Sequence, residues 1–176
     1  MQVQTERDLQ NFVWNLVEER KDIEDLPLED YLRSLWGLIC ECQHYKPTYA
    51  LFAELLEKSF ITPPLPFNYN WFQYTQPPDI ENISANLNDF EVLKQTVLFQ
   101  IADLRRLSDA GTINNPHRYF GISSPTGEYW HNFEPCLMLD CAMNCIRGHQ
   151  DRTLPDKTEC DWATLADILE MGRIYE

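Results

Sequence analysis

The chain has 176 residues, and its 28 acidic side chains outnumber 14 basic ones to give a formal net charge of −14. This surplus argues against nucleic acid as a direct ligand and against an anionic membrane surface, because both attract basic protein faces. No stretch approaches the roughly 20 apolar residues of a transmembrane helix, so no membrane partner is expected. The 44% of hydrophobic residues are enough for the core of one ordinary domain.

The first predicted helix covers Glu6–Lys21. Thr5 is a suitable N-cap, and Asp8 follows three residues later, as in a capping box. Beyond this helix, Pro27 interrupts a strongly acidic stretch at residues 18–30. Within the first predicted helix, residues 6–21, apolar residues recur at the spacing of one helix face, which predicts an amphipathic helix. That face consists of Leu9, Phe12, Val13, Leu16 and Val17.

Two further helices are expected before residue 60. One covers Leu28–Gln43, and its apolar arc is wide enough to predict that most of this helix is buried. Pro47 suits the first turn of the next helix, and the apolar pattern of that helix fades at Ser59.

Residues 62–79 form a segment of different composition, with the sequence TPPLPFNYNWFQYTQPPD. Its five prolines exclude a regular helix at both ends. Phe67, Tyr69 and Trp71 alternate with asparagines, which favours a short edge strand or an extended loop. No lysine or arginine occurs between Lys58 and Lys94.

Three more helices are expected in the second half of the chain. The longest covers Asp89–Leu107, with Asn88 as its cap and two arginines near its end, where positive charge suits the helix dipole. Another begins at Pro135 and runs to Arg147, with Gly148 as its stop. The last follows Asp161 and runs to Met171, with Gly172 closing it.

Residues 118–133 are expected to form one β-hairpin. Two aromatic-rich arms flank the sequence Ser-Pro-Thr-Gly at 124–127, which suits a type I turn followed by a left-handed glycine. A lone hairpin is marginally stable in water, so it has to pack on helices or pair with the aromatic segment. The predicted fold class is therefore mainly α with a small β-hairpin (α+β), as a single-domain irregular bundle of about six helices over residues 1–176.

The six cysteines and the N-terminal sequence favour a cytoplasmic protein with reduced thiols. The first ten residues lack the basic and apolar regions of a secretory signal. A chain of this length can also fold without disulfides. The cysteines are Cys40, Cys42, Cys136, Cys141, Cys145 and Cys160.

The preferred functional hypothesis is a non-enzymatic acidic protein that binds another protein. Exposed aromatic clusters commonly mark contact sites, and a surplus of carboxylates attracts basic partners. An antidote that neutralises a basic toxin is one instance, and a homo-oligomer stays open. No cofactor is expected. The candidate contact residues are Phe67, Tyr69, Trp71, Phe72 and Tyr74, together with the acidic Glu24 and Asp25.

A metal- or thiol-dependent site is the first alternative. Cys141, Cys145 and His149 recur every four residues, and Cys40 and Cys42 lie near a further histidine. Zinc takes four such ligands in a tetrahedron, so two clusters that meet in space could hold it. Burial of the cysteines in the core is the competing interpretation, because free cysteine is among the most buried residues.

An enzyme with a pocket between the hairpin and the helices is the second alternative. His117, Arg118 and Asp140 are its candidate residues. The chain contains no GxSxG, HExxH or glycine-rich phosphate loop, so no motif supports a particular reaction.

Overall fold

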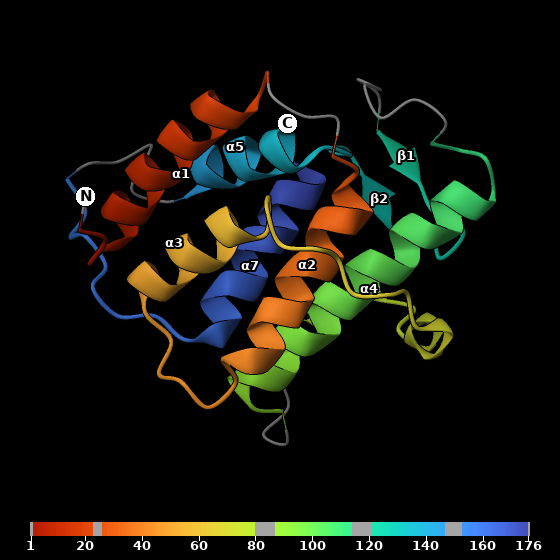
Figure 1. The fold of residues 1–176 in the computed structure, drawn as a ribbon, viewed down its shortest axis with the longest axis horizontal. Coiled ribbons are helices and arrows are strands. Elements are labelled where there is room, and N and C mark those ends of the chain that lie inside the picture. The colour runs from red at the N-terminus through yellow and green to blue at the C-terminus, as the bar shows by residue number, and fades with distance from the viewer. Residues whose placement is uncertain (1, 23–25, 80–86, 114–120, 147–152, 176) are drawn as a thin grey trace.

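The computed structural model describes residues 2–22, 26–79, 87–113, 121–146 and 153–175. It confirms a mainly α fold with a small antiparallel hairpin (Figure 1). None of the described helices is long and apolar enough to span a bilayer. The elements are α1 (Glu6–Arg20), α2 (Leu28–Glu41), α3 (Tyr49–Lys58), the 3-10 helix η1 (Tyr69–Gln73), α4 (Asp89–Asp109), β1 (Ile122–Ser123), β2 (Tyr129–Trp130), α5 (Pro135–Cys145) and α7 (Trp162–Ile174).

One continuous hydrophobic core joins these helices. Helix α7 packs against both α4 and α5, α2 lies against α4 and α3, and α1 contacts α3 and α5. Large side chains from most of these elements converge in the core. The wide apolar arc of α2 is buried as expected, with Tyr31, Leu32, Leu35 and Ile39 fully enclosed.

The helix starts follow the capping residues. The Thr5 hydroxyl accepts a hydrogen bond from the Asp8 amide and completes a capping box, and Asn88 caps α4 as predicted. The expectation for Pro47 is wrong by two residues, because Thr48 accepts a hydrogen bond from the amide of Leu51 and takes the cap position. Pro47 therefore precedes α3 rather than entering its first turn.

The last two helices do not end where the glycines predicted, and the ends of α2 and α4 each differ from the expected residue by two. Gly172 does not close α7, which continues to Ile174. A Cβ atom at Gly172 would lie 2.5 Å from the carbonyl oxygen of Met138, so glycine is needed there for close approach of α7 to α5. Helix α5 ends at Cys145, where Ile146 is already extended, and Gly148 lies outside the described residues.

The hairpin is shorter than predicted within the described residues. Ile122 pairs with Trp130 and Ser123 with Tyr129. The Gly127 amide donates to the Ser124 carbonyl over 2.8 Å, and Gly127 has a φ of 87°, as the turn sequence predicts. The hairpin packs on α7, so it gains the helix support that two short strands require.

The proline- and aromatic-rich segment 62–79 is neither an edge strand nor extended throughout. It runs from α3 without regular structure, crosses α2, and forms the single 3-10 turn η1 beside α4 (Figure 1). The Asn68 side chain accepts a hydrogen bond from the Asn70 amide and caps this turn. Asn68, one of the asparagines whose alternation with aromatic residues favoured an extended segment, therefore starts a turn instead.

Candidate functional site: the aromatic segment and the pocket beside it

The aromatic segment, residues 62–79, is organised around the ring of Phe67. Trp71 and Phe72 lie 5.4 and 5.1 Å from it between ring centroids, and Tyr69 lies 5.6 Å away in an edge-on arrangement. Such tilted and edge-on pairs are favourable geometries for aromatic rings. Four rings that are close in sequence therefore form one cluster on the η1 turn.

Two consecutive arginines of α4 hold this segment in place. The Arg105 guanidinium lies 4.2 Å above the Phe67 ring, in a cation–π contact. Arg106 donates hydrogen bonds to the carbonyl oxygens of Phe72 and Tyr74, at 2.7 and 3.1 Å. From the sequence, both arginines were expected only to interact favourably with the helix dipole. Nothing in the sequence indicates that they also bind the aromatic segment.

Helix α2 holds the start of the same segment. The Ser34 hydroxyl donates to the carbonyl oxygen of Thr62 over 2.7 Å, and Arg33 donates to the carbonyl oxygen of Leu65. The segment is thus attached to two helices, mainly through its own backbone oxygens.

The five predicted contact residues differ in exposure. Phe67, Trp71 and Tyr74 are half-buried and pack against the core, so they support the segment as well as covering the helices. Tyr69 is 74% exposed, although its ring is part of the cluster. Leu65, which the sequence analysis did not single out, is also exposed.

A buried carboxylate connects this segment to the hairpin. Asp103 of α4 is fully buried and accepts hydrogen bonds from the Trp130 indole over 2.7 Å and from the Thr126 hydroxyl over 2.9 Å. It also pairs with Arg106, the arginine that binds the aromatic segment. A single aspartate therefore fixes the hairpin and the segment on the same helix.

A second charged side chain clamps the other side of the hairpin. Arg173 of α7 is buried, donates to the carboxylate of Glu170 over 2.7 Å and to the carbonyl oxygen of Tyr129, and lies near Glu128. Burial raises the pKa of the Glu170 carboxyl, while neighbouring Arg173 acts to lower it. The hydrogen bond from Arg173 to Tyr129 attaches the second strand to α7, while the ion pair with Glu170 lies within α7 and holds the guanidinium in place.

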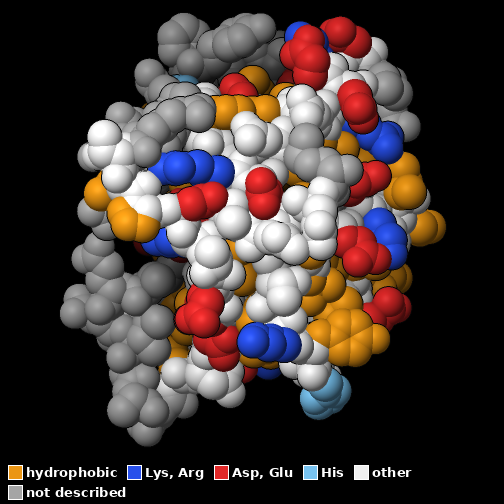
Figure 2. Space-filling model, turned by 90° about the vertical axis from the view of Figure 1, so that its left-hand side faces the viewer, with side chains coloured by type: hydrophobic (Ala, Val, Ile, Leu, Met, Phe, Trp, Pro, Cys, Tyr) orange, Lys and Arg blue, Asp and Glu red, His pale blue; other side chains and the backbone are white. Residues whose placement is uncertain are grey.

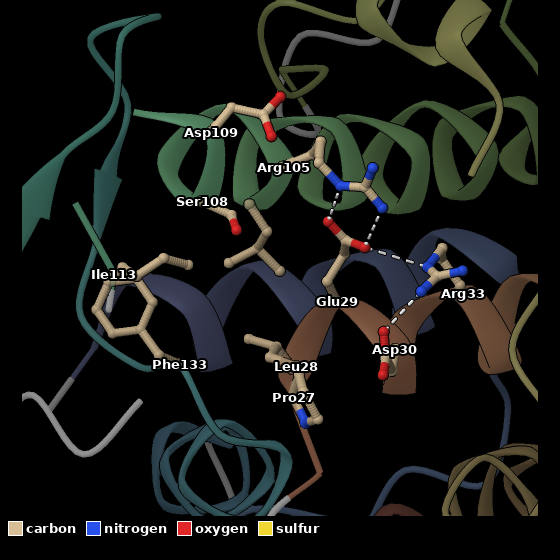
Figure 3. A pocket seen from close by; sticks show the side chains of 11 residues that line it. Pro27, Leu28, Glu29, Asp30, Arg33, Arg105, Ser108, Asp109, Ile113 and Phe133 are labelled. Atoms are coloured by element: carbon tan, nitrogen blue, oxygen red, sulfur yellow. Dashed lines mark hydrogen bonds and ion pairs between the residues drawn. The ribbon is translucent and has the colours of Figure 1, made fainter. Parts of the chain in front are cut away.

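A pocket of about 500 Å³ lies between the start of α2 and the second half of α4 (Figure 3). Its volume is typical of ligand-binding pockets, which span about 300–1,000 Å³. Pro27, Leu28, Leu104, Ile113 and Phe133 form its apolar lining. Its polar lining consists of Glu29, Asp30, Arg33, Arg105, Ser108 and Asp109.

Charged side chains cross the space between the two helices along one wall of this pocket. Glu29 accepts two hydrogen bonds from Arg105, at 2.7 and 2.8 Å, and lies 3.2 Å from Arg33. Arg33 in turn contacts Asp30 at 2.6 Å (Figure 3). The paired Glu29 carboxylate raises the pKa of Arg105, which keeps the guanidinium charged. Arg33 and Arg105 also contact the aromatic segment, so the pocket and the segment share a wall.

The predicted cysteine clusters do not form a metal site in the part of the chain that the structure describes. No three metal-ligating side chains there lie close enough together to hold an ion. Cys141 is buried, whereas Cys40 is exposed and Cys42 and Cys145 are half-buried. Partial loss of solvent around the sulfur atoms raises the pKa of Cys40, Cys42 and Cys145, the opposite of what an activated nucleophile requires. His149 lies outside the described residues.

Several other candidate residues from the sequence cannot be assigned to a site. Glu24 and Asp25 of the acidic stretch, and His117 and Arg118 of the proposed enzyme pocket, lie outside the described residues. Asp140 is half-buried on α5 and does not line the pocket described above.

The N-terminal side of the molecule carries two other hollows, on either side of the start of α3. One has a volume of about 530 Å³ and includes Lys46 and Glu159, and the other, of about 440 Å³, includes Glu54 and Lys58. Acidic and basic side chains lie next to one another across this side (Figure 2). Each hollow is therefore lined by side chains of both signs.

Comparisons with known proteins were made at three levels. No protein-family model, no curated protein and no solved structure matches this chain. What the described residues bring together is an ordered aromatic cluster with one exposed tyrosine, and a charged pocket that shares two arginines with it.

Proposed function

We propose that this chain is a non-enzymatic protein-interaction protein that binds a basic partner through the aromatic segment 62–79. The observation that carries the proposal is the position of Tyr69, which is 74% exposed on a turn whose other rings are held against the helices. Tyrosine is among the residues that most often anchor protein interfaces.

The rigid attachment of the segment favours binding. Arg105 and Arg106 hold its rings and its backbone on α4, and Phe67 packs against Tyr69 from within the cluster. A side chain that is already ordered loses little conformational entropy when a partner covers it. Leu65 and its neighbouring prolines extend the exposed apolar surface next to Tyr69 in sequence.

Charge supports a basic partner. The net charge is −14, and the three arginines that contact the segment, Arg33, Arg105 and Arg106, each pair with an acidic side chain. A negative protein surface speeds the approach of basic proteins and rejects acidic ones. Added salt screens these interactions, so complex formation should weaken as ionic strength rises.

The test is capture of binding proteins by wild-type protein and by a Tyr69→Ser variant, at low and at high salt, with quantitative mass spectrometry. Loss of an interface anchor lowers affinity by about tenfold or more. We therefore expect captured proteins to be basic, to elute with salt, and to be depleted on Tyr69→Ser.

Tyr45→Ser is the matched control, because Tyr45 is also an exposed tyrosine, at 61%, but follows α2 outside the segment. Both variants should unfold at the same temperature as the wild type, since neither side chain is buried. The proposal is wrong if Tyr69→Ser retains the same proteins as Tyr45→Ser, or if salt leaves their retention unchanged.

A further inference from the structure

We infer that the pocket between α2 and α4 receives an arginine or lysine side chain of the partner. This inference rests on the proposed function, which it deepens by naming the group that the partner inserts.

The two arginines of the pocket are already engaged. Arg105 uses two nitrogens on Glu29 and stacks its guanidinium on Phe67, and Arg33 contacts both Asp30 and the carbonyl oxygen of Leu65. An anion would have to compete with these contacts. It would also meet the carboxylates that line the pocket, which outnumber the guanidinium groups.

Asp109 is the carboxylate that is open to a cation. It is exposed at the last residue of α4 and pairs with no side chain among the described residues, although it lies close enough to Arg105 to influence it. Ser108, also exposed, adds a hydroxyl beside it at the rim. These two groups offer acceptors to an incoming N–H donor.

The rest of the pocket suits the aliphatic part of a basic side chain. Leu28, Leu104 and Phe133 are buried residues whose surfaces line it, and Ile113 closes the same side (Figure 3). Arginine and lysine combine an apolar stem with a charged head, so they bury the one and keep the other at a polar rim. A small anion or a purely apolar group would match only half of this lining.

The position of the pocket fits a partner that sits on the aromatic segment. Arg33 and Arg105 line the pocket and also contact Leu65 and Phe67 of the segment. A protein that covers the exposed residues Leu65 and Tyr69 therefore lies against the wall that bounds the pocket. One contact surface then contains an aromatic anchor and an acidic recess.

Binding of n-butylguanidinium, monitored by NMR at the methyl groups of Leu28, Leu104 and Ile113, tests this inference without an identified partner. We expect saturable shifts at these methyls with n-butylguanidinium, weaker effects with neutral n-butylurea, and none with pentanoate. Asp109→Asn should weaken butylguanidinium binding by about two- to fivefold, the range for one exposed charge pair.

Glu41→Gln is the matched control, because Glu41 is an exposed carboxylate at the last residue of α2, as Asp109 is of α4. It should leave binding unchanged. The inference is overturned if n-butylguanidinium produces no saturable shift, if n-butylurea or pentanoate binds as well, or if the two variants behave alike.

The captured proteins give a second and separate readout. Asp109→Asn should lower retention of the proteins that depend on Tyr69, whereas Glu41→Gln should not. If Tyr69→Ser releases these proteins but Asp109→Asn does not, the interaction surface stands and the pocket is not part of it. If Tyr69→Ser releases nothing, the proposed function itself is wrong, whatever the small cation does.

Discussion

Asp103 shows how much a single side chain can organise in this molecule. Its fully buried carboxylate binds the Trp130 indole, the Thr126 hydroxyl and the Arg106 guanidinium, which belong to the hairpin and to α4. Charge-assisted hydrogen bonds are stronger than neutral ones, and their loss leaves buried donors without partners. The sequence places Asp103 on the longest helix but gives no sign of this role, because its partners in the hairpin, Thr126 and Trp130, lie more than 20 residues away.

Replacement of this residue should be costly. Asp103→Ala is expected to lower the free energy of unfolding by about 3–5 kcal/mol, the range for removing one partner of a buried charged pair. Asp109→Ala, at an exposed position of the same helix, should change it by no more than about 0.5 kcal/mol. Urea denaturation of both variants measures the difference, and similar values would show that the Asp103 contacts contribute little.

The thiols provide a second prediction at the residue scale. Burial raises the pKa of Cys160 from 9.0 to about 11, which reduces its thiolate fraction near neutral pH by about a hundredfold. Alkylation of Cys160 by iodoacetamide, followed by peptide mass spectrometry, should therefore be about tenfold slower or more than that of an ordinary thiol, because the greater nucleophilicity of the more basic thiolate offsets part of the loss. The rate should recover in concentrated urea. A fast reaction in the folded protein would contradict the raised pKa of Cys160.

At the scale of elements, local signals in the sequence predicted where helices begin better than where they end. Thr5, Asn88 and Asp161 cap their helices because capping depends on neighbouring residues alone. Gly172 has the composition of a helix stop, yet its role depends on the backbone of α5, a contact between distant parts of the chain. Likewise, the turn at residues 69–73 packs against α4, a contact between parts of the chain that the local sequence does not reveal.

The clamp between the hairpin and α7 predicts a pH dependence. Because burial raises the pKa of Glu170 above 4.5, the folded protein retains this proton over a range in which the unfolded chain has released it. Unfolding then releases a proton, so the contribution of Glu170 to stability decreases as pH rises from 4.5 through the folded pKa. The difference in unfolding free energy between wild type and Glu170→Gln should fall across this range.

Glu128→Gln serves as the control for that measurement, because Glu128 lies near the same arginine but is half-exposed on the hairpin. The raised pKa of Glu170 would be contradicted if the difference in unfolding free energy between wild type and Glu170→Gln stays constant, or grows, as pH rises.

At the scale of the whole molecule, composition and periodicity predicted the fold class, whereas the candidate site could be predicted only in part. The apolar faces of the helices meet in one core because each helix must bury its apolar stripe against another element. The aromatic segment stood out by composition, and its rings do cluster. The pocket did not stand out, since Glu29, Arg105 and Phe133 are far apart in sequence and meet only when α2 and α4 pack.

The hydrogen bonds that attach segment 62–79 to the helices have a consequence for which of its residues can be exchanged. The described hydrogen bonds from α2 and α4 end on the main-chain oxygens of Thr62, Leu65, Phe72 and Tyr74. Every amino acid supplies such an oxygen, so an outward-facing residue such as Tyr69 can be exchanged without loosening these attachments. The two helices thus hold the backbone of this segment whatever its outward side chains are, so related chains could change the exposed residues and keep the same attachment.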